Sequence, residues 1–550
     1  MKRPATYQKL RGGYYTPPPI AKFLSSWAIR SASDRVLEPS CGDGVFLEAS
    51  AKRLFELRAK PHNISSQILA YELDGPEAAQ AAQRLCQFSP NAKGNVHSGD
   101  FFSSAVTWNG DHKFDAIVGN PPFVRYQNFP EEQRINAFQI MQKFGLHPNR
   151  LTNAWVPFVV AAAGLLKANG RLAMVAPAEL LQVTYAAELR LFLAKHFDQI
   201  RVITFRGLPF PGIQQEVVLL LAIKDSSLHR GIEVLELDDA SDLFATASQG
   251  FGENGVKTID QDGGKWTQYY LSQQEIELLR SLRADVRLTK FGELAHTDVG
   301  VVTGMNDVFV LPGEEVSKEG LTAFVCRLVG GSAQLPGTIF KESDWARNVK
   351  SGSKVFLLNI PPVQLSEMPA NVAAYFKKAE QLGLHLGFKC RTRKLWHVVP
   401  SVYVPDAFMF RQIHHYPKLI ANQAKATCTD TIHRVRFKRR ANASRIAAAF
   451  MNSLTFAFSE IIGRSYGGGV LELEPNEADT LPIPLLHSDR LDPNEIDRLV
   501  RSSPIENVLA ITDKVLLAGG LGLKDRQIKM LRSIWLKLQR RRTGRRNGND

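Results

Sequence analysis

The sequence predicts an α/β protein whose first part is a doubly wound, mostly parallel, Rossmann-like sheet. Between residues 30 and 225, short apolar strands alternate with amphipathic helical stretches. This alternation is typical of a parallel sheet that carries helices on both faces. Past about residue 230 the alternation ends, and the full length of 550 residues is enough for about two to four domains. We therefore expect a second domain of mixed α+β structure after the sheet.

The elements of the first domain follow from the apolar pattern. The predicted strands are residues 35–38, 68–72, 114–118, 171–175 and 217–222, and the predicted helices are residues 46–58, 76–86 and 155–167. Pro76 stands at the first position of its helix, where the missing N–H has no partner to lose. Because ligands of doubly wound sheets bind outside the carboxyl ends of the strands, we expect the functional residues in the loops that follow these strands.

Two loops set the expected domain boundaries. Residues 225–227 and the Gly- and Asp-rich residues 249–264 have the composition of loops. The predicted organisation is a first domain over residues 1–230, a connecting region over 231–290, a second domain over 291–525 and a basic tail over 526–550. We expect the tail to be disordered from Lys537 onward, because it contains a dense run of arginines.

The composition excludes several classes of protein. Hydrophobic residues make up 44% and charged residues 22% of the chain, as in globular rather than disordered proteins. The five cysteines are never closely paired, which argues against a disulfide scaffold or a zinc ribbon. The most apolar run, residues 154–166, contains Pro157 and is too short to span a bilayer. The first 15 residues are basic and polar, unlike a secretory signal. We expect a soluble, cytoplasmic protein with no membrane partner.

The positive charge is concentrated in the C-terminal half. The net charge is +14, and residues 341–440 alone contain 18 Lys or Arg residues against 6 Asp or Glu residues. Residues 521–550 add 10 basic residues against 2 acidic ones. A surface of this kind binds polyanions, because each neutralised phosphate releases counterions. The pattern favours a nucleic-acid partner over the alternative of a charge excess that only aids solubility.

The first predicted strand leads into a candidate cofactor loop. It ends in Glu38, and a tight turn with Gly42 and Gly44 then leads into a helix. Glycine lets the backbone approach a ligand closely. A dinucleotide fingerprint would need a third glycine, and Glu38 and Asp43 would repel a phosphate. Acidic side chains suit a ligand with a cationic amino group and ribose hydroxyls, and S-adenosylmethionine fits this description. A purely structural turn is the alternative.

Acidic residues also follow the next two strands. Glu72 ends the second strand, where a carboxylate can accept both ribose hydroxyls. Asp100 follows a further strand, expected just before Ser98, and can accept a hydrogen bond from an adenine amino group, with Phe101 beside it to pack on the ring. Each acid taken singly could be a helix cap. Three acids in order at successive strand ends favour one cofactor site.

Residues 119–123, Gly-Asn-Pro-Pro-Phe, follow a predicted strand and form the candidate catalytic motif. The Asn120 side chain offers a carbonyl acceptor, and Pro122 restrains Pro121 so that the Pro121 carbonyl is held rigidly. Two acceptors that converge on an exocyclic amine orient its lone pair toward an incoming methyl group. Phe123 supplies a face on which a planar base can stack. The alternative is a loop that the prolines merely stiffen.

These motifs together resemble the gamma class of adenine-specific DNA methyltransferases of restriction–modification systems. In that class the cofactor motifs precede the catalytic motif and the target-recognition domain comes last. The resemblance to this order covers nearly the whole chain. The resemblance implies a methyltransferase catalytic domain followed by a DNA target-recognition domain. It implies a cofactor site of Thr16, Glu38, Ser40, Cys41, Gly42, Gly44, Glu72, Asp100 and Phe101, and a catalytic site of Asn120, Pro121, Pro122 and Phe123.

The resemblance extends to segments outside these motifs. Thr16 and the two prolines after it look like the family's N-terminal element beside the methionine part of the cofactor. Phe210, with Phe205 nearby, looks like the aromatic residue that closes the other side of the flipped base. Segments at 302–309, 393–396 and 467–484 resemble parts of the recognition domains.

The candidate DNA contacts combine cations with an aromatic residue. They are Lys389, Arg391, Arg393, Lys394 and Trp396. Side chains of these types contact phosphates and bases, although each taken singly could belong to a solvated surface.

The sequence departs from the family pattern at a few points. Phe123 stands where Tyr is frequent, and stacking needs only the ring. Relatives that methylate the cytosine amino group more often have Ser in place of Asn120, so cytosine stays an alternative to adenine. No Pro-Cys pair exists in the chain, which excludes methylation of a cytosine carbon. About 15 residues precede Thr16, so we expect no fused N-terminal nuclease.

The expected activity is methyl transfer from S-adenosylmethionine to the exocyclic amine of an adenine flipped out of a specific duplex sequence. This chemistry requires no metal and no covalent intermediate. The expected partners are duplex DNA and a separately encoded cognate restriction endonuclease, and we expect a monomer. Two alternatives remain: a methyltransferase that acts on RNA or on a protein glutamine amide, and a non-catalytic DNA-binding subunit with a degenerate cofactor fold.

Overall fold

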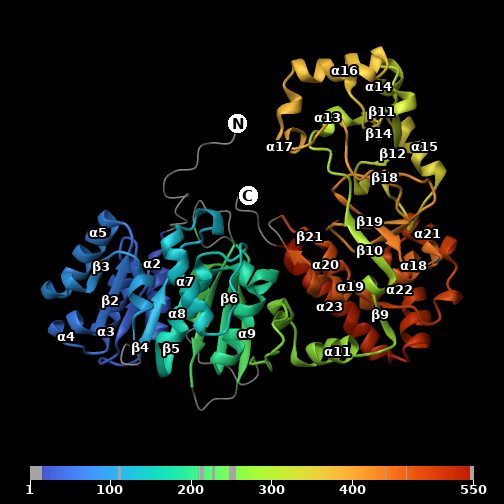
Figure 1. Cartoon of the computed structure of the whole chain (residues 1–550). Helices are drawn as coiled ribbons and strands as arrows, with labels where there is room; N and C mark the ends of the chain where they lie inside the picture. Colours follow the sequence, from blue (N-terminus) through green and yellow to red (C-terminus); the bar gives the residue numbers. More distant parts are fainter. Residues whose placement is uncertain are drawn as a thin grey trace. The chain divides into compact units, whose positions relative to one another are not determined.

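The structure is a computed structural model that describes residues 15–108, 113–207, 210, 216–225, 230–246, 255–439, 441–465 and 468–544. The chain forms two compact units, which we call the N-terminal unit (Met1–Gln273 with Gly544–Asp550) and the C-terminal unit (Gln274–Thr543). Figure 1 shows both along the sequence colours. The division lies inside the predicted connecting region, and each unit is described by itself.

The N-terminal unit contains the predicted doubly wound sheet. Its eight strands lie in the order β3-β2-β1-β4-β5-β7-β6-β8. The strands are β1 (Val36–Glu38), β2 (Ile68–Glu72), β3 (Val96–Ser98), β4 (Phe114–Gly119), β5 (Leu166–Pro177), β6 (Gln199–Phe205), β7 (Val217–Ile223) and β8 (Gly231–Leu237). All neighbouring pairs are parallel except those of β7, which is antiparallel to both β5 and β6. The prediction of a mostly parallel sheet is confirmed.

Helices cover both faces of this sheet. They are α2 (Pro18–Ala28), α3 (Val45–Glu56), α4 (Pro61–Gln67), α5 (Gly75–Cys86), α6 (Phe101–Ala105), α7 (Glu131–Lys143), α8 (Trp155–Leu165), α9 (Ala187–His196) and α10 (Leu243–Thr246). Alternate residues of β4, such as Ala116 and Val118, join one apolar cluster with α2, α3 and α5. Ile117 lies between them and is equally buried. Because successive strand residues point to opposite faces, both faces of the sheet are covered, as Figure 1 also shows.

The C-terminal unit is a mixed α+β structure with several small sheets. The sheets have the strand orders β10-β19-β15-β17-β13, β11-β14-β12-β18, β16-β21-β20 and β22-β9. The strands are β9 (Leu288–Lys290), β10 (Ala295–Val299), β11 (Val310–Pro312), β12 (Val325–Val329), β13 (Ile339–Phe340), β14 (Lys354–Leu358), β15 (Ala407–Phe410), β16 (Gln412–Ile413), β17 (Leu419–Asn422), β18 (Thr427–Cys428), β19 (Ile432–Phe437), β20 (Arg464–Ser465), β21 (Leu471–Glu472) and β22 (Pro482–Pro484). Short strands with irregular spacing explain why the sequence pattern does not define these elements individually.

The helices of this unit pack between and around the sheets. They are α11 (Gln273–Arg283), α12 (Phe291–Leu294), α13 (Asn306–Phe309), α14 (Gly313–Lys318), α15 (Glu342–Lys350), α16 (Ala370–Gln381), α17 (Phe388–Arg391), α18 (Ala443–Phe450), α19 (Ser453–Ile462), α20 (Pro475–Ala478), α21 (Pro493–Ser502), α22 (Ile505–Thr512) and α23 (Asp525–Thr543). In Figure 1, α13, α14, α16 and α17 lie together at one end of the unit with β11 and β14. None of the helices among the described residues is both long and apolar enough for a membrane span.

The prediction that the chain is disordered from Lys537 onward is wrong for the residues up to Thr543. They continue α23, which packs against α19. The Arg542 guanidinium is only 2% exposed and donates to the buried Glu460 carboxylate at 2.9 Å. An apolar stripe at Leu531, Ile534, Trp535 and Leu538 holds the helix in place. The many arginines of this segment favour a prediction of disorder even though the apolar residues recur at helical spacing. Which of the cations are buried depends on tertiary contacts and cannot be judged from composition.

Candidate active site

Most of the predicted cofactor and catalytic residues line one cavity at the carboxyl ends of β1, β2, β3 and β4. The cavity has a volume of about 710 Å³, which is within the usual range for small-molecule sites. Its lining includes Thr16, Glu38, Ser40, Cys41, Gly42, Glu72, Asp100, Phe101, Asn120 and Pro122. The sheet brings these residues together, because the carboxyl ends of its parallel strands lie at one edge.

Glu38 is the most deeply buried charge of the cavity. Its side chain is 1% exposed, and its Oε2 atom has no hydrogen-bond partner. Burial, together with the negative charges of Asp43 and Glu72, raises the pKa of Glu38 well above its usual value. A buried acceptor without a donor is costly, so the cavity offers a strong site for a cationic or N–H-bearing group at this carboxylate.

The two predicted loop glycines have different roles. Gly42, at φ +52°, has open space where a Cβ would stand, and its N–H donates to Glu72 Oε2 at 2.8 Å. Gly44, at φ +88°, caps α3, and a Cβ there would lie 2.8 Å from the Cα of Ala81 on α5. Gly42 therefore leaves room on the cavity side, whereas Gly44 allows α3 and α5 to pack closely.

Glu72 and Asp100 are both engaged with the backbone. Glu72 Oε1 accepts from the Asp74 N–H at 2.9 Å, in addition to its bond with Gly42. Asp100 caps α6 by accepting from the N–H groups of Phe102 at 3.2 Å and Ser103 at 3.0 Å. The alternative of a helix cap therefore holds for Asp100. Each carboxylate oxygen has a second lone pair, so both side chains can still accept a ligand hydroxyl or amine.

Arg84 on α5 is a loop partner that the sequence patterns do not reveal. Its guanidinium forms a 2.7 Å ion pair with Asp43 and lies 3.5 Å from Glu48. This pairing balances one of the loop's negative charges, whereas desolvation still raises the pKa of Asp43. No spacing rule connects positions 43 and 84, because the packing of α3 against α5 brings them together.

Thr16 fixes the orientation of the candidate catalytic amide. The Asn120 Nδ2 atom donates to Thr16 Oγ1 at 3.2 Å across 104 positions of sequence. The amide nitrogen is thus held on the Thr16 side, so that the carbonyl oxygen occupies the opposite side of the amide plane. Asn120 and Thr16 both line the cavity that contains Glu38 and Glu72.

The neighbours of the catalytic motif complete the wall of the cavity. Two predicted catalytic residues are not among the described residues that line the cavity: Pro121 is buried, and Phe123 is half-buried against the apolar cluster of the N-terminal unit. The Val124 carbonyl accepts from the Ala154 N–H at 2.9 Å, which fixes the loop to the start of α8. Phe158 on α8 also lines the cavity and packs against Phe101, with ring centroids 5.7 Å apart. Its place in an apolar helix gives it no distinguishing signal in the sequence.

The segment predicted to close over a flipped base is described only in part. Leu208, Pro209, Pro211 and Gly212 lie outside the described residues. Phe210 is 2% exposed and belongs to the same apolar cluster that Phe123 packs against. Its ring is therefore covered here, and its role as a stacking partner stays a prediction.

Comparison with known proteins bears on nearly the whole chain. Residues 52–209 match the family model of the Eco57I restriction-modification methylase. Residues 263–517 match that of the C-terminal domain of the type II methyltransferase M.Eco57I. The type II methyltransferase M.AccI of Acinetobacter calcoaceticus is 22% identical over 490 residues, which cover 86% of this chain and 85% of M.AccI. The chain belongs to the type II restriction–modification methyltransferases.

Two further similarities agree with this family. The type II methyltransferase M.HindII of Haemophilus influenzae is 23% identical over 330 residues, 57% of this chain and 58% of M.HindII. The solved structure of the type IIL restriction-modification enzyme MmeI in complex with DNA gives a TM-score of 0.56 at 13% identity, over 95% of this chain and 75% of MmeI. At that identity the likeness concerns the fold alone, and it confirms a Rossmann-like unit followed by a further domain.

The candidate DNA contacts of this methyltransferase divide into exposed and inward-facing side chains. Lys389, Arg391 and Lys394 are exposed. The Arg393 guanidinium donates to the carbonyls of Val302 at 2.9 Å and Thr303 at 2.8 Å. Trp396 packs against Phe309 and Phe376 and donates from its indole N–H to Glu380 at 2.8 Å. The last two predicted residues therefore support the local fold, and a DNA contact by the first three stays a prediction.

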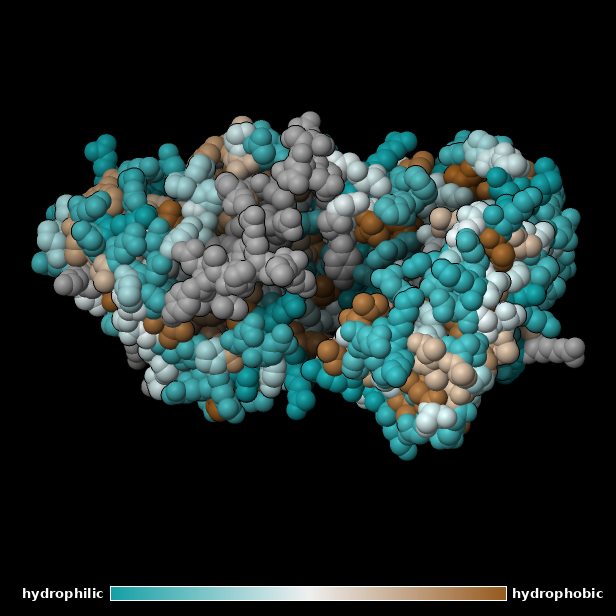
Figure 2. Space-filling model, turned by 90° about the horizontal axis from the view of Figure 1, so that it is seen from above, coloured by the Kyte–Doolittle hydropathy of each residue, from teal (hydrophilic) through white to brown (hydrophobic). Residues whose placement is uncertain are grey.

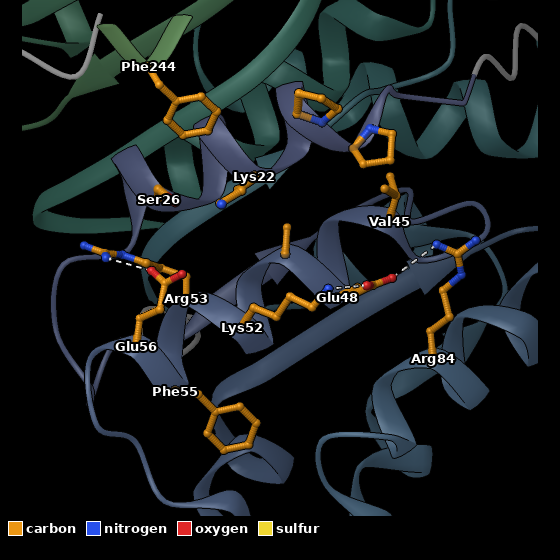
Figure 3. A pocket seen from close by; sticks show the side chains of 13 residues that line it. Lys22, Ser26, Val45, Glu48, Lys52, Arg53, Phe55, Glu56, Arg84 and Phe244 are labelled. Atoms are coloured by element: carbon orange, nitrogen blue, oxygen red, sulfur yellow. Dashed lines mark hydrogen bonds and ion pairs between the residues drawn. The ribbon is translucent and has the colours of Figure 1, made fainter. Parts of the chain in front are cut away.

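A second pocket of the methyltransferase, of about 840 Å³, lies between α2 and α3 (Figure 3). Figure 3 shows Glu48 between Lys52 and Arg84, and Arg53 beside Glu56. These charges pair with one another, so the pocket lacks the convergent acidic groups of the first cavity. The first cavity is therefore the candidate active site.

Proposed function

We propose that this protein transfers a methyl group from S-adenosylmethionine to the exocyclic amino group of an adenine in a specific sequence of duplex DNA. The observation that carries the proposal is the shared cavity, in which the Thr16-oriented Asn120 amide stands beside the acidic ends of β1 and β2. A methyl donor and an amine acceptor need this juxtaposition, because holding two reactants in line supplies much of the rate.

The acidic residues fit the cofactor. The Glu38 carboxylate, buried and with an unpartnered oxygen, would accept from the amino group of the methionine part. Glu72, already oriented by two backbone N–H groups, would accept from the ribose hydroxyls. Asp100 would accept from the adenine amino group, with Phe101 packed beside the ring. Bound there, the cofactor supplies an electrophilic methyl group.

The catalytic loop would act on the target amine. The side-chain carbonyl of Asn120 and the main-chain carbonyl of Pro121 would each accept a hydrogen bond from one N–H group of the amine. This arrangement directs the nitrogen lone pair away from both acceptors and stabilises the positive charge that develops on nitrogen during transfer. Phe123 would stack on the base, which must leave the duplex to reach the cavity.

Modified-base sequencing of DNA from a methylation-free host that expresses the chain tests this proposal. We expect N6-methyladenine at one recurring sequence motif. Cytosine methylated on its amino group at that motif would show that the target is cytosine and not adenine. Unmodified DNA together with methylation of RNA or of a protein glutamine amide would overturn the proposal, as would a chain that fails to bind S-adenosylmethionine by calorimetry.

The Asn120→Ala variant tests the assignment of the catalytic residue. We expect it to reduce methyl transfer by more than tenfold, because the amine loses an acceptor that the transition state needs, while the Kd for S-adenosylmethionine stays near that of the wild type. A variant that keeps more than about a tenth of the wild-type rate would contradict the assigned role.

We further propose that the enzyme acts as a monomer, protecting its sequence from a separately encoded restriction endonuclease. Sedimentation of the complex with a single-site duplex tests the first point, since two copies on one site would exclude a monomer. Digestion of methylated and unmethylated DNA with the endonuclease encoded beside it tests the second, since equal cleavage would exclude protection.

A further inference from the structure

The tip of the C-terminal unit between α16 and α17 exposes apolar side chains in an unusual concentration. Leu382, Leu386 and Phe388 are 68%, 62% and 66% exposed, within seven positions of one another. Among the described residues of this unit, Phe388 is the aromatic side chain with the largest exposed fraction. Single exposed apolar residues are ordinary, but a contiguous group marks an interaction surface. Figure 2 looks onto the end of the unit that carries α14 and α16, and it shows hydrophobic areas within a hydrophilic surface.

Several exposed cations lie close in the sequence to this apolar tip. They are Lys377, Lys378, Lys389, Arg391 and Lys394, all exposed, and none of them forms an ion pair with another described residue. Residues 381–400 contain four Lys or Arg residues and no Asp or Glu. The Lys389 Nζ lies 5.9 Å from the centre of the Phe388 ring. The surface therefore presents an aromatic ring among positive charges, which suits a polyanion with flat apolar faces.

The tip is also firmly held. Arg393, just after α17, donates to the carbonyls of Val302 and Thr303, and Cys390 anchors α17 because its side chain is fully buried. Trp396 connects it to α16 through the Glu380 carboxylate. A rigid support is what an inserting side chain requires, because a flexible tip would fold back instead of separating the bases.

We propose that the α16–α17 tip is a wedge that inserts Phe388, with Leu386 beside it, between base pairs of the bound duplex. The surrounding cations, Lys389, Arg391 and Lys394 among them, hold the adjacent phosphates. Apolar wedges of this type unstack a base step and kink and unwind the helix. The inference depends on the proposed DNA substrate but adds a deformation of the DNA that methyl transfer by itself does not imply.

Helical unwinding measures the wedge directly. A binding sequence is first selected by repeated rounds of binding to the full-length protein, and an array of it is cloned into a plasmid. Topoisomerase then relaxes this plasmid in the presence of the protein, and the linking number of the plasmid is determined. We expect the wild type to unwind the DNA and Phe388→Ala to lose most of the unwinding that the wedge causes. Phe388→Leu should keep much of this unwinding, because leucine also acts as a wedge. Val286→Ala, at a 96% exposed apolar position of the same unit, is the matched control and should behave as the wild type.

Affinity and its salt dependence separate the ring from the charges. Because base–aromatic stacking is worth about 1–3 kcal/mol, Phe388→Ala should weaken binding by about tenfold with the salt slope unchanged. The triple Lys389→Gln, Arg391→Gln, Lys394→Gln variant should lower that slope by about one for each phosphate that the protein no longer neutralises.

Several outcomes would overturn the inference. Equal unwinding by the wild type and Phe388→Ala would exclude a wedge, even if the charge variant bound DNA more weakly. Self-association of the wild type that Phe388→Ala abolishes would assign the tip to a protein contact instead. DNA that is methylated but not unwound would refute the wedge and leave the proposed function standing, whereas unwinding without methylation would do the reverse.

Discussion

Replacing Glu38 with glutamine should increase the stability of the folded apoprotein and weaken its binding of S-adenosylmethionine. The two effects have one origin, the charge of a carboxylate that is 1% exposed and has an unpartnered Oε2 atom. Glutamine keeps the size of the side chain and removes that charge. A residue that only supported the loop would change both properties in the same direction, so the opposite signs distinguish a ligand-binding role.

The size of each effect follows from the surroundings of the carboxylate. A hydrogen bond between a charged acceptor and a cationic amine contributes about 1.5–3 kcal/mol, so its loss should raise the Kd by about 10- to 150-fold. Above the folded pKa, where Glu38 is charged, the unpaired carboxylate costs the apoprotein at least about 1–3 kcal/mol. Removing the charge should raise the Tm by about 2–4 °C for each kcal/mol regained in a unit of this size.

The pH dependence of stability independently tests whether the Glu38 charge destabilises the apoprotein. Burial and the neighbouring carboxylates Asp43 and Glu72 raise the pKa of folded Glu38 well above the usual value of 4.5. Between these two pKa values the folded state holds a proton that the unfolded state has released, so stability falls as the pH rises through this window. The contribution is present below pH 4.5 and lost above the folded pKa. In Glu38→Gln this dependence should disappear.

Calorimetric titration and thermal unfolding of the apoprotein between pH 4 and pH 9 measure these effects. Glu56→Gln, at a 51% exposed side chain of the same unit, serves as the control and should change neither property. An unchanged Kd in Glu38→Gln would remove this residue from the cofactor site. A lower Tm at pH 8 would show that the carboxylate stabilises the apoprotein, and the argument from an unpaired charge would then be wrong.

Three further changes test other parts of the structure. Thr16→Val removes the acceptor that orients the Asn120 amide, so kcat should fall about three- to tenfold and recover in Thr16→Ser; an unchanged kcat would exclude the orienting role. Arg542→Ala leaves a buried carboxylate unpaired and should lower the unfolding free energy by about 3–5 kcal/mol in denaturant titration, whereas the exposed Arg540→Ala should have no effect; equal stabilities would show that α23 is held without this ion pair. Asp100→Asn keeps a good helix-capping residue but removes the charge, so calorimetry should show weaker cofactor binding at unchanged Tm, and an unaltered Kd would contradict its place in the cofactor site.

The sequence by itself determined the local features of the N-terminal unit. Strands are short apolar runs, and the functional side chains of parallel strands follow their carboxyl ends, so Glu38, Glu72 and Asn120 could be assigned to one edge of the sheet before any contact was known. The rigidity of the Asn-Pro-Pro motif is equally local, because proline restricts its own backbone and that of the preceding residue.

Only the tertiary structure decided burial and pairing. Thr16 orients Asn120 from 104 positions away, and Arg84 pairs with Asp43 because α3 packs against α5. Arg393, which the charge pattern groups with the exposed cations, turns instead toward the carbonyls of residues 302 and 303. A residue type specifies which bonds a side chain can form, but the segments that fold around it determine whether water, the backbone or another side chain is the partner.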